Sequence, residues 1–196
     1  MKQRLAEIAD IQAGYPFRGS IKHDKNGSVR VVQAKDISDL GELLLSDLVQ
    51  TEPTGKKQPT WLQEGDVLFI AKGMRNFAAH VSRDLEHVTC SPSLFQIRIK
   101  PAFKESVNPL FIAWQLNQKP VQHYLRKSAE GSTQINIRKP VLGDVELAIP
   151  DIAQQNTIAK LYNASVKENA LLNKLINNRQ QQLNAIATDL IQNSNK

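Results

Sequence analysis

Cysteine is nearly absent from this sequence, and so are long apolar runs. Cys90 is the single cysteine among 196 residues, which excludes an internal disulfide and any cysteine pair that frames a zinc site. The four histidines stand in unlike contexts, without the spacing of metal ligands. No apolar run approaches the roughly 18 to 20 residues of a transmembrane helix, and the start, MKQRLAEIADIQ, lacks the apolar core of a signal peptide. We therefore expect a cytoplasmic protein that holds no metal.

Motifs of catalysis and cofactor binding are missing as well. Neither G-x-G-x-x-G nor G-x-x-x-x-G-K-[ST] occurs, so the glycine loops that hold nucleotide phosphates are absent. No G-x-S-x-G turn supports a serine nucleophile. The tetrapeptide Asn108–Phe111 approaches the N-P-P-[YF] motif of adenine methyltransferases but lacks its second proline, and an Asn-Pro pair is typical of a helix start. We expect no catalytic residue and no cofactor on this chain.

The charge balance favours an anionic partner. The sequence has 25 Lys and Arg against 19 Asp and Glu, a net charge of +6 and a pI near 9.5. Such an excess suits a polyanion without identifying one. No run of Lys or Arg forms a basic arm, so a surface that binds nucleic acid has to be assembled by folding.

Glycine and proline divide the chain in two. Neither residue occurs in the 46 positions after Pro150, whereas all nine glycines precede it. Because both residues break helices, their absence predicts one long helix over residues 154–191, about 57 Å long, with Asp151 as its N-cap. The sequence therefore predicts a globular domain over residues 1–150 and a helical segment over residues 151–196.

The apolar pattern of this segment predicts a coiled coil. Alternate steps of four and three residues from Ile158 meet apolar side chains at seven of ten positions, and Ser165, Asn169 and Arg179 interrupt them. A helix with one apolar stripe needs a second helix to cover it, from another copy or another subunit. The alternative is a helix that folds back on its own domain. The candidate contacts are Ile158, Tyr162, Leu172, Ile176, Leu183, Ile186 and Leu190.

The first 150 residues predict a mixed α/β (α+β) domain with a mixed sheet. Short segments rich in Val, Ile and Phe, bounded by turn residues, predict strands at 29–33, 66–71, 94–99 and 145–149. A first helix is expected before Gly14, and apolar residues at helical spacing predict two short helices within 109–127, divided at Pro120. Strands and helices do not alternate regularly, which excludes a doubly wound fold.

Three glycine-containing loops carry basic and amide side chains. They are the segments 14–20, 72–76 and 131–139. Arg and Lys bind phosphates or guanine, Asn and Gln pair with adenine, and backbone near glycine admits a phosphate closely. Each loop alone is weak support for contact with DNA, but the three together favour it.

Taken in order, these segments resemble the specificity subunit of type I restriction-modification systems. The resemblance rests on LAEIADIQAGYPFRGS at the start, LQEGDVLFIAKGMRN at 62–76, GSTQINIRKPVLGDVELAIPDIAQQNTIAKL at 131–161, and the helix that follows. It implies a DNA target recognition domain over residues 1–150 and a conserved spacer helix after it. Members of the family usually have two of each, so this chain resembles a half-length form.

The resemblance also implies a function and partners. It implies a non-catalytic subunit that binds double-stranded DNA, pairs with a second copy through its helix, and directs adenine methyltransferase and restriction (motor) subunits to a bipartite site. S-adenosylmethionine, ATP and Mg²⁺ would then belong to those subunits. Two alternatives are a small nuclease or methyltransferase, and a coiled-coil DNA-binding adaptor or repressor without a methyltransferase partner. The candidate DNA contacts are Arg18, Lys35, Lys72, Arg75, Asn76, Gln134, Asn136 and Arg138.

Overall fold

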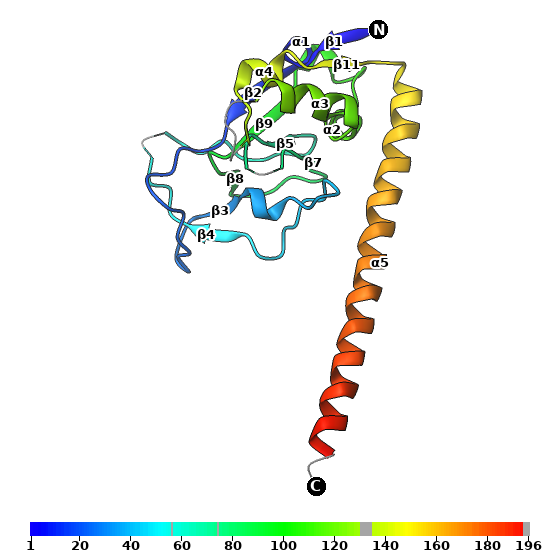
Figure 1. Ribbon diagram of the computed structural model, residues 1–196. Coiled ribbons are helices and arrows are strands. Elements are labelled where there is room, and N and C mark those ends of the chain that lie inside the picture. The colour runs from blue at the N-terminus through cyan, green and yellow to red at the C-terminus, as the bar shows by residue number, and fades with distance from the viewer. Residues whose placement is uncertain (56, 74, 130–134, 194–196) are drawn as a thin grey trace. The chain divides into compact units, whose positions relative to one another are not determined.

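The computed structural model describes residues 1–55, 57–73, 75–129 and 135–193 (Figure 1). Contacts within the chain divide it into two compact units, Met1–Ala159 and Lys160–Lys196. The first unit, which we call the globular domain, holds the strands and the short helices of the described residues. The second unit consists of the rest of the long helix α5 (Ile152–Asn193).

A four-stranded antiparallel sheet forms the centre of the globular domain. Its strands, in spatial order, are β2 (Ala9–Ala13), β9 (Leu94–Ile99), β5 (Val67–Ile70) and β7 (Ala78–His80). Every residue of β5 is buried, and its alternate side chains enter two different apolar clusters, as Val67 and Leu68 illustrate. The sheet therefore has a core on each of its faces.

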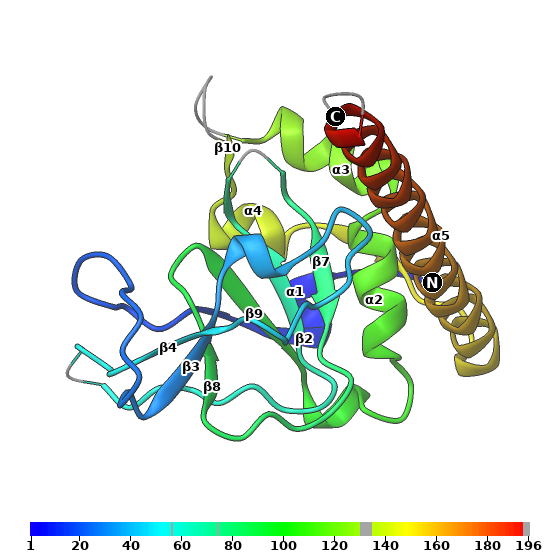
Figure 2. The same ribbon diagram turned by 90° about the horizontal axis from the view of Figure 1, so that it is seen from below.

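Helices cover one face of this sheet, and a second sheet covers the other (Figures 1 and 2). The helices are α1 (Leu5–Ile8), α2 (Pro109–Leu116), α3 (Lys119–Lys127) and α4 (Lys139–Gly143). The second sheet has the order β4 (Val49–Thr51), β3 (Val29–Val32), β8 (Val88–Cys90). Because β3 pairs antiparallel with β4 and parallel with β8, the predicted mixed α+β fold with a mixed sheet is confirmed.

Two short ladders join distant parts of the chain. Strand β1 (Lys2–Arg4) pairs antiparallel with β11 (Glu146–Ala148), which precedes α5. Strand β6 (Lys72–Gly73) pairs antiparallel with β10 (Ile135–Asn136). Two 3-10 turns, η1 (Ala34–Asp36) and η2 (Pro101–Phe103), complete the domain as described.

The predicted strands are present, as β3, β5, β9 and β11, and so are the two short helices. The two helices are separated by Asn117 and Gln118 and not by Pro120. Pro120 lies in the first turn of α3, where a backbone N–H has no partner within the helix, so a proline is tolerated there. The prediction of a helix before Gly14 is correct only for the single turn of α1 and is wrong for the residues that follow it. Residues 9–13 form β2 instead, since buried Ile11 alternates with exposed Asp10 and Gln12.

A buried carboxylate joins the central strands. Asp66 accepts hydrogen bonds from Arg98 Nε (2.7 Å) and Nη2 (2.8 Å), from Gln96 Nε2 (2.7 Å) and from the Gln63 backbone N–H (2.8 Å). This hydrogen bonding raises the pKa of the Arg98 guanidinium. The network holds the start of β5 against β9.

Gly14 allows two strands to approach closely. Its N–H donates to the Leu94 carbonyl at 3.0 Å, and the next N–H, that of Tyr15, donates to the Cys90 carbonyl at 2.8 Å. A Cβ at Gly14 would overlap the carbonyl of Ser91, so a larger residue has no room there. The chain leaving β2 therefore lies directly against the end of β8.

Cys90 offers a test of this packing. Its thiol is buried, and burial raises its pKa from 9.0 to about 12. Because the thiolate is the reactive form, we expect a thiol reagent at pH 8 to leave the native protein unmodified and to label the urea-unfolded chain within minutes. Mass spectrometry of both samples measures this difference, and rapid labelling of the native protein would contradict the buried position.

The long helix starts inside the globular domain. Asp151 caps it as predicted, with its carboxylate accepting from the Gln154 N–H at 2.9 Å. Gln155 is fully buried, accepts from the Asn108 N–H at 2.9 Å, and donates to the carbonyls of Ser106 and Pro150, each at 2.8 Å. Ile158 packs against the domain core. Ile158 is only partly buried there, so its contact in a coiled coil stays a prediction.

Apolar side chains are exposed along the second unit. Tyr162, in the first turn of this unit, is partly exposed. The large aliphatic side chains exposed by more than half are Leu161, Leu171, Leu172, Leu175, Ile176, Leu183, Ile186, Leu190 and Ile191. Five of the predicted coiled-coil residues are among them. In the described part of the chain, no helix has both the length and the hydropathy to cross a bilayer.

Candidate nucleic-acid interface

The β6–β10 ladder joins two of the loop segments that the sequence singled out. In its register Lys72 pairs with Asn136 and Gly73 with Ile135, and the Ile137 N–H donates to the Ala71 carbonyl at 2.8 Å. The Lys72 side chain is exposed, and that of Asn136 is half-buried. A cation and a carboxamide that are 64 positions apart in the sequence thus become neighbours.

Arg75 lies just beyond this ladder and connects it to a third segment. Its guanidinium forms an ion pair with Asp39, and both side chains are mostly exposed. Asp39 follows η1, which carries the exposed Lys35. The segment around Lys35 therefore lies beside the turn after β6. An exposed ion pair of this kind contributes little stability, so Arg75 is available to exchange Asp39 for a phosphate.

Asn76 is not exposed on the surface of the domain. Its side chain is buried, and Nδ2 donates to the Ile70 carbonyl at 2.8 Å. Its own carbonyl accepts from Gln122 Nε2 at 2.8 Å. Asn76 thus fixes the turn between β6 and β7 and joins it to α3, which corrects the prediction that it reads bases to a structural role.

Helix α3 supplies a basic face that sequence reasoning missed. Lys119, His123, Arg126 and Lys127 are all exposed, and their spacing of four, three and one residues places them on one side of the helix. No acidic residue occurs in α3. Gln122 of this helix contacts the turn at Asn76, so α3 lies next to the turn that follows β6, and Figure 2 shows α3 near β10.

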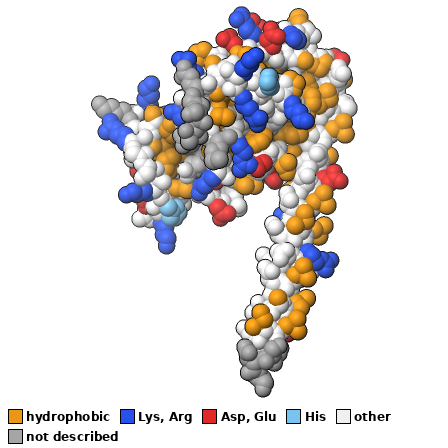
Figure 3. All heavy atoms as spheres, in the orientation of Figure 1, with side chains coloured by type: hydrophobic (Ala, Val, Ile, Leu, Met, Phe, Trp, Pro, Cys, Tyr) orange, Lys and Arg blue, Asp and Glu red, His pale blue; other side chains and the backbone are white. Residues whose placement is uncertain are grey.

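These residues form one cationic region, which we call the β6/α3 surface. Arg138 is exposed at the N-cap of α4, two residues after the ladder. Figure 3 shows Lys and Arg side chains gathered on the face of the globular domain that it presents. The β6/α3 surface is made of Lys72, Arg75, Lys119, Arg126, Lys127, Asn136 and Arg138.

Two other predicted contacts lie elsewhere. Arg18 is exposed in the loop after β2, where its N–H donates to the Thr54 hydroxyl at 2.7 Å, and this bond ties it to the segment after β4 and not to the β6/α3 surface. Gln134 lies outside the described residues. Within the described ranges, no group of three or more His, Cys, Asp and Glu side chains is placed to hold a metal ion.

Solved structures with a similar fold exist. A chain from a study of complex assembly and conformational transition in the type I R-M system matches with a TM-score of 0.57 at 20% identity, over 88% of this chain and 39% of that one. The HsdS subunit from Thermoanaerobacter tengcongensis matches with a TM-score of 0.57 at 18% identity, over 89% and 39%. The type I restriction-modification S subunit from M. genitalium matches with a TM-score of 0.55 at 17% identity, over 88% and 40%.

The chain thus spans about two fifths of the length of these structures. Among curated proteins, none matches it. The family model of the type I restriction modification DNA specificity domain matches residues 1–181, from the first strand to near the end of the long helix. This chain therefore belongs to the type I restriction-modification DNA specificity family.

Proposed function

We propose that this chain is a DNA-binding specificity subunit that acts without catalytic groups of its own. The observation that carries the proposal is the β6–β10 ladder, which sets Lys72 and Asn136 side by side next to the basic face of α3. Lys and Arg contacts to phosphates position a protein on duplex DNA, and a carboxamide can read a base edge. The β6/α3 surface combines both kinds of group.

The proposal extends to the assembly. Because α5 exposes large apolar side chains along the second unit, we propose that two copies pair through α5 and that each reads one half of a bipartite site. Methyltransferase subunits would bring S-adenosylmethionine and modify adenine, and a restriction subunit would bring ATP hydrolysis. The exposed apolar side chains of the second unit supply the pairing surface.

DNA modification in a host tests the whole proposal. We expect a host that expresses this chain together with its methyltransferase subunit to acquire methylated adenines at one symmetric, bipartite site. Single-molecule sequencing of the host genome reads site, spacing and symmetry together. Methylation that is independent of this chain, or DNA cleavage by the purified chain with Mg²⁺ alone, would contradict it.

Removal of charge from α3 tests the interface directly. We expect the double variant Arg126→Gln/Lys127→Gln to weaken binding to all duplexes by about tenfold at 150 mM salt. The slope of log K against log salt should also fall, by about one for each phosphate that the variant no longer neutralises. Fluorescence anisotropy with a labelled duplex measures both quantities.

The control is Arg83→Gln, which removes one positive charge from a different part of the domain. Arg83 is exposed and follows the C-terminal end of β7. That end lies beside the start of β5, because His80 pairs with Val67, so Arg83 sits at the end of the sheet opposite to β6. We expect Arg83→Gln to keep both affinity and slope. Equal losses in the two variants would mean that α3 has no particular part in binding.

A further inference from the structure

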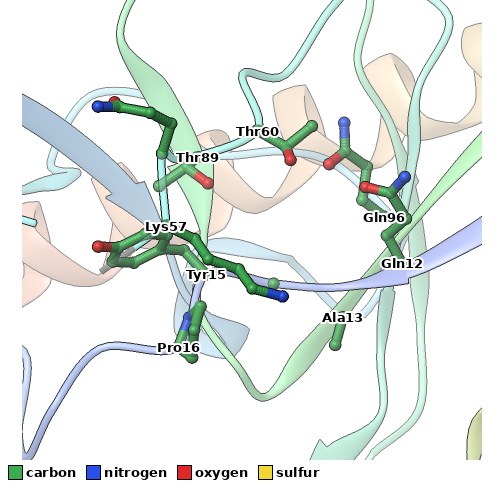
Figure 4. Close-up of a pocket in the computed structure, with 10 residues that line it drawn as sticks. Gln12, Ala13, Tyr15, Pro16, Lys57, Thr60, Thr89 and Gln96 are labelled. Carbon is green, nitrogen blue, oxygen red and sulfur yellow. The ribbon is translucent and has the colours of Figure 1, made fainter. Parts of the chain in front are cut away.

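A polar hollow opens near the end of β2, away from α3. Its volume is about 390 Å³, and it lies between the end of β2, the segment that precedes β5, and strands β8 and β9 (Figure 4). Carboxamides, hydroxyls and one ammonium group line it, and none of the described residues that line it is acidic. The groups that matter most are Gln12, Lys57, Gln58, Thr60 and Thr89.

Thr89 places an unused hydroxyl in this hollow. The residue is only 2% exposed, and its hydroxyl makes no hydrogen bond within the described part of the chain. The same part contains no fully enclosed side-chain N or O atom that lacks a partner. The Thr89 hydroxyl therefore keeps contact with the hollow, and Figure 4 shows Thr89 among the residues that line it. The Thr89 hydroxyl can therefore bond to a group that enters the hollow.

The polar side chains at the rim of the hollow also make no hydrogen bonds to the described residues. The side chains of Gln12, Lys57, Gln58 and Thr60 are exposed, and the described residues offer them no hydrogen bond or ion pair. Gln96 is different, because its Nε2 already donates to Asp66 at 2.7 Å. The available groups are thus two carboxamides, two hydroxyls and one cation, which can donate to or accept from a nucleobase edge.

The hollow and the β6/α3 surface lie at the same end of the central sheet. Ala13, at the end of β2, pairs with Phe95 at the start of β9, and Phe95 pairs with Phe69 near the end of β5. Strand β6 follows directly, and the Lys72 N–H donates to the Ser93 carbonyl at 3.1 Å. The ends of β2 and β5 are two strand spacings apart, roughly 10 Å. One DNA duplex is wide enough to contact both regions.

We propose that this hollow is the base-reading site of the domain. Gln12 and Gln58 read the edge of a nucleobase, Lys57 binds a guanine edge or the adjacent phosphate, and Thr60 and Thr89 bond to the group that enters deepest. The β6/α3 surface then supplies mainly phosphate contacts. The inference rests on the proposed function, and it separates sequence reading from general affinity for DNA.

Selection from a randomised duplex library tests the assignment. The intact chain is compared with Gln12→Ala, Gln58→Ala and the nearly isosteric Thr89→Val, and the enriched duplexes are sequenced. We expect each variant to relax discrimination at one or two base positions by about tenfold, the effect of removing one good base contact, while the salt slope stays unchanged. Gln154→Ala, an exposed carboxamide at the start of α5, is the control that keeps the wild-type preference.

The outcomes separate this inference from the proposed function. Wild-type protein that enriches no sequence would overturn both. Enrichment that is identical in the wild-type protein and in all three variants would overturn only the assignment of the hollow, because Gln12 and Gln58 are exposed and their truncation leaves the fold intact. Deoxynucleoside monophosphates are added as a further arm. If they bind the hollow at micromolar concentration while the variants leave DNA selection unchanged, the hollow is a free-nucleotide site and the assignment is wrong.

Discussion

Replacement of Asp66 by asparagine is expected to destabilise the globular domain by about 3 kcal/mol, because a buried ion pair that loses one partner leaves the other uncompensated. Asp66 is buried and carries four hydrogen bonds, two of them from the Arg98 guanidinium. The expected loss is at the lower end of the range for buried pairs, since the Arg98 side chain is 38% exposed and water can approach it.

Urea unfolding followed by circular dichroism measures this effect. The control is Glu146→Gln, which breaks the ion pair of Glu146 with Lys2, where the side chains are 64% and 75% exposed. We expect that variant to lose less than about 1 kcal/mol, as exposed pairs do. A similar small loss in Asp66→Asn would show that the network contributes little to stability. The Asp66 network also supports the proposed base-reading site, because Gln96 belongs to this network and lines the hollow.

The double substitution Leu172→Glu/Leu183→Glu is expected to abolish pairing through α5. In the single chain these side chains are 51% and 54% exposed, and they lie in the alternating four-and-three pattern of a coiled coil. Carboxylates placed in that apolar stripe would have to be buried in the paired state, which is costly for an unpaired charge. Light scattering at micromolar concentration should give about twice 21.9 kDa for the wild-type protein and 21.9 kDa for the variant.

DNA binding should respond in the same way. A dimer holds its second half-site contact at a high effective concentration, so its loss lowers the affinity for a bipartite site by about 100-fold or more and leaves half-site binding unchanged. The control is Lys174→Gln, which changes the charge by one unit, as each Leu→Glu substitution does. Lys174 lies on the opposite side of the helix from Leu172, so this variant should remain dimeric. If the wild-type protein stays monomeric, the proposed pairing of two copies is wrong, and the apolar stripe contacts another kind of subunit.

Local patterns predicted much of the fold, because they depend on neighbouring residues. Segments rich in Val, Ile and Phe between turn residues identified β5 and β9 of the central sheet, and the absence of glycine and proline identified α5. The ladder between Lys72 and Asn136 could not be predicted, since a two-residue strand has no pattern of its own. Ile158 fits the heptad equally well whether it packs on its domain or on a partner, so periodicity alone could not place it.

The candidate site could also be predicted only in part from the sequence. The basic face of α3 was readable in the sequence, as four cationic or titratable residues at helical spacing from Lys119 to Lys127. Asn76 was predicted wrongly because an amide in a turn bonds to the backbone as readily as to a ligand. Thr89 gave no signal at all, since a threonine in a β-strand is ordinary, and only the packed structure shows its hydroxyl at the hollow, without a hydrogen bond to any described residue.

The ladder between β1 and β11 has a consequence for how such domains evolve. Lys2 pairs with Ala148, so the backbone begins the domain and leaves it at neighbouring points. A unit of this kind can be inserted into, removed from or exchanged between longer polypeptides without stretching either connection. The geometry therefore makes the domain a unit that a longer polypeptide can gain, lose or exchange as a whole.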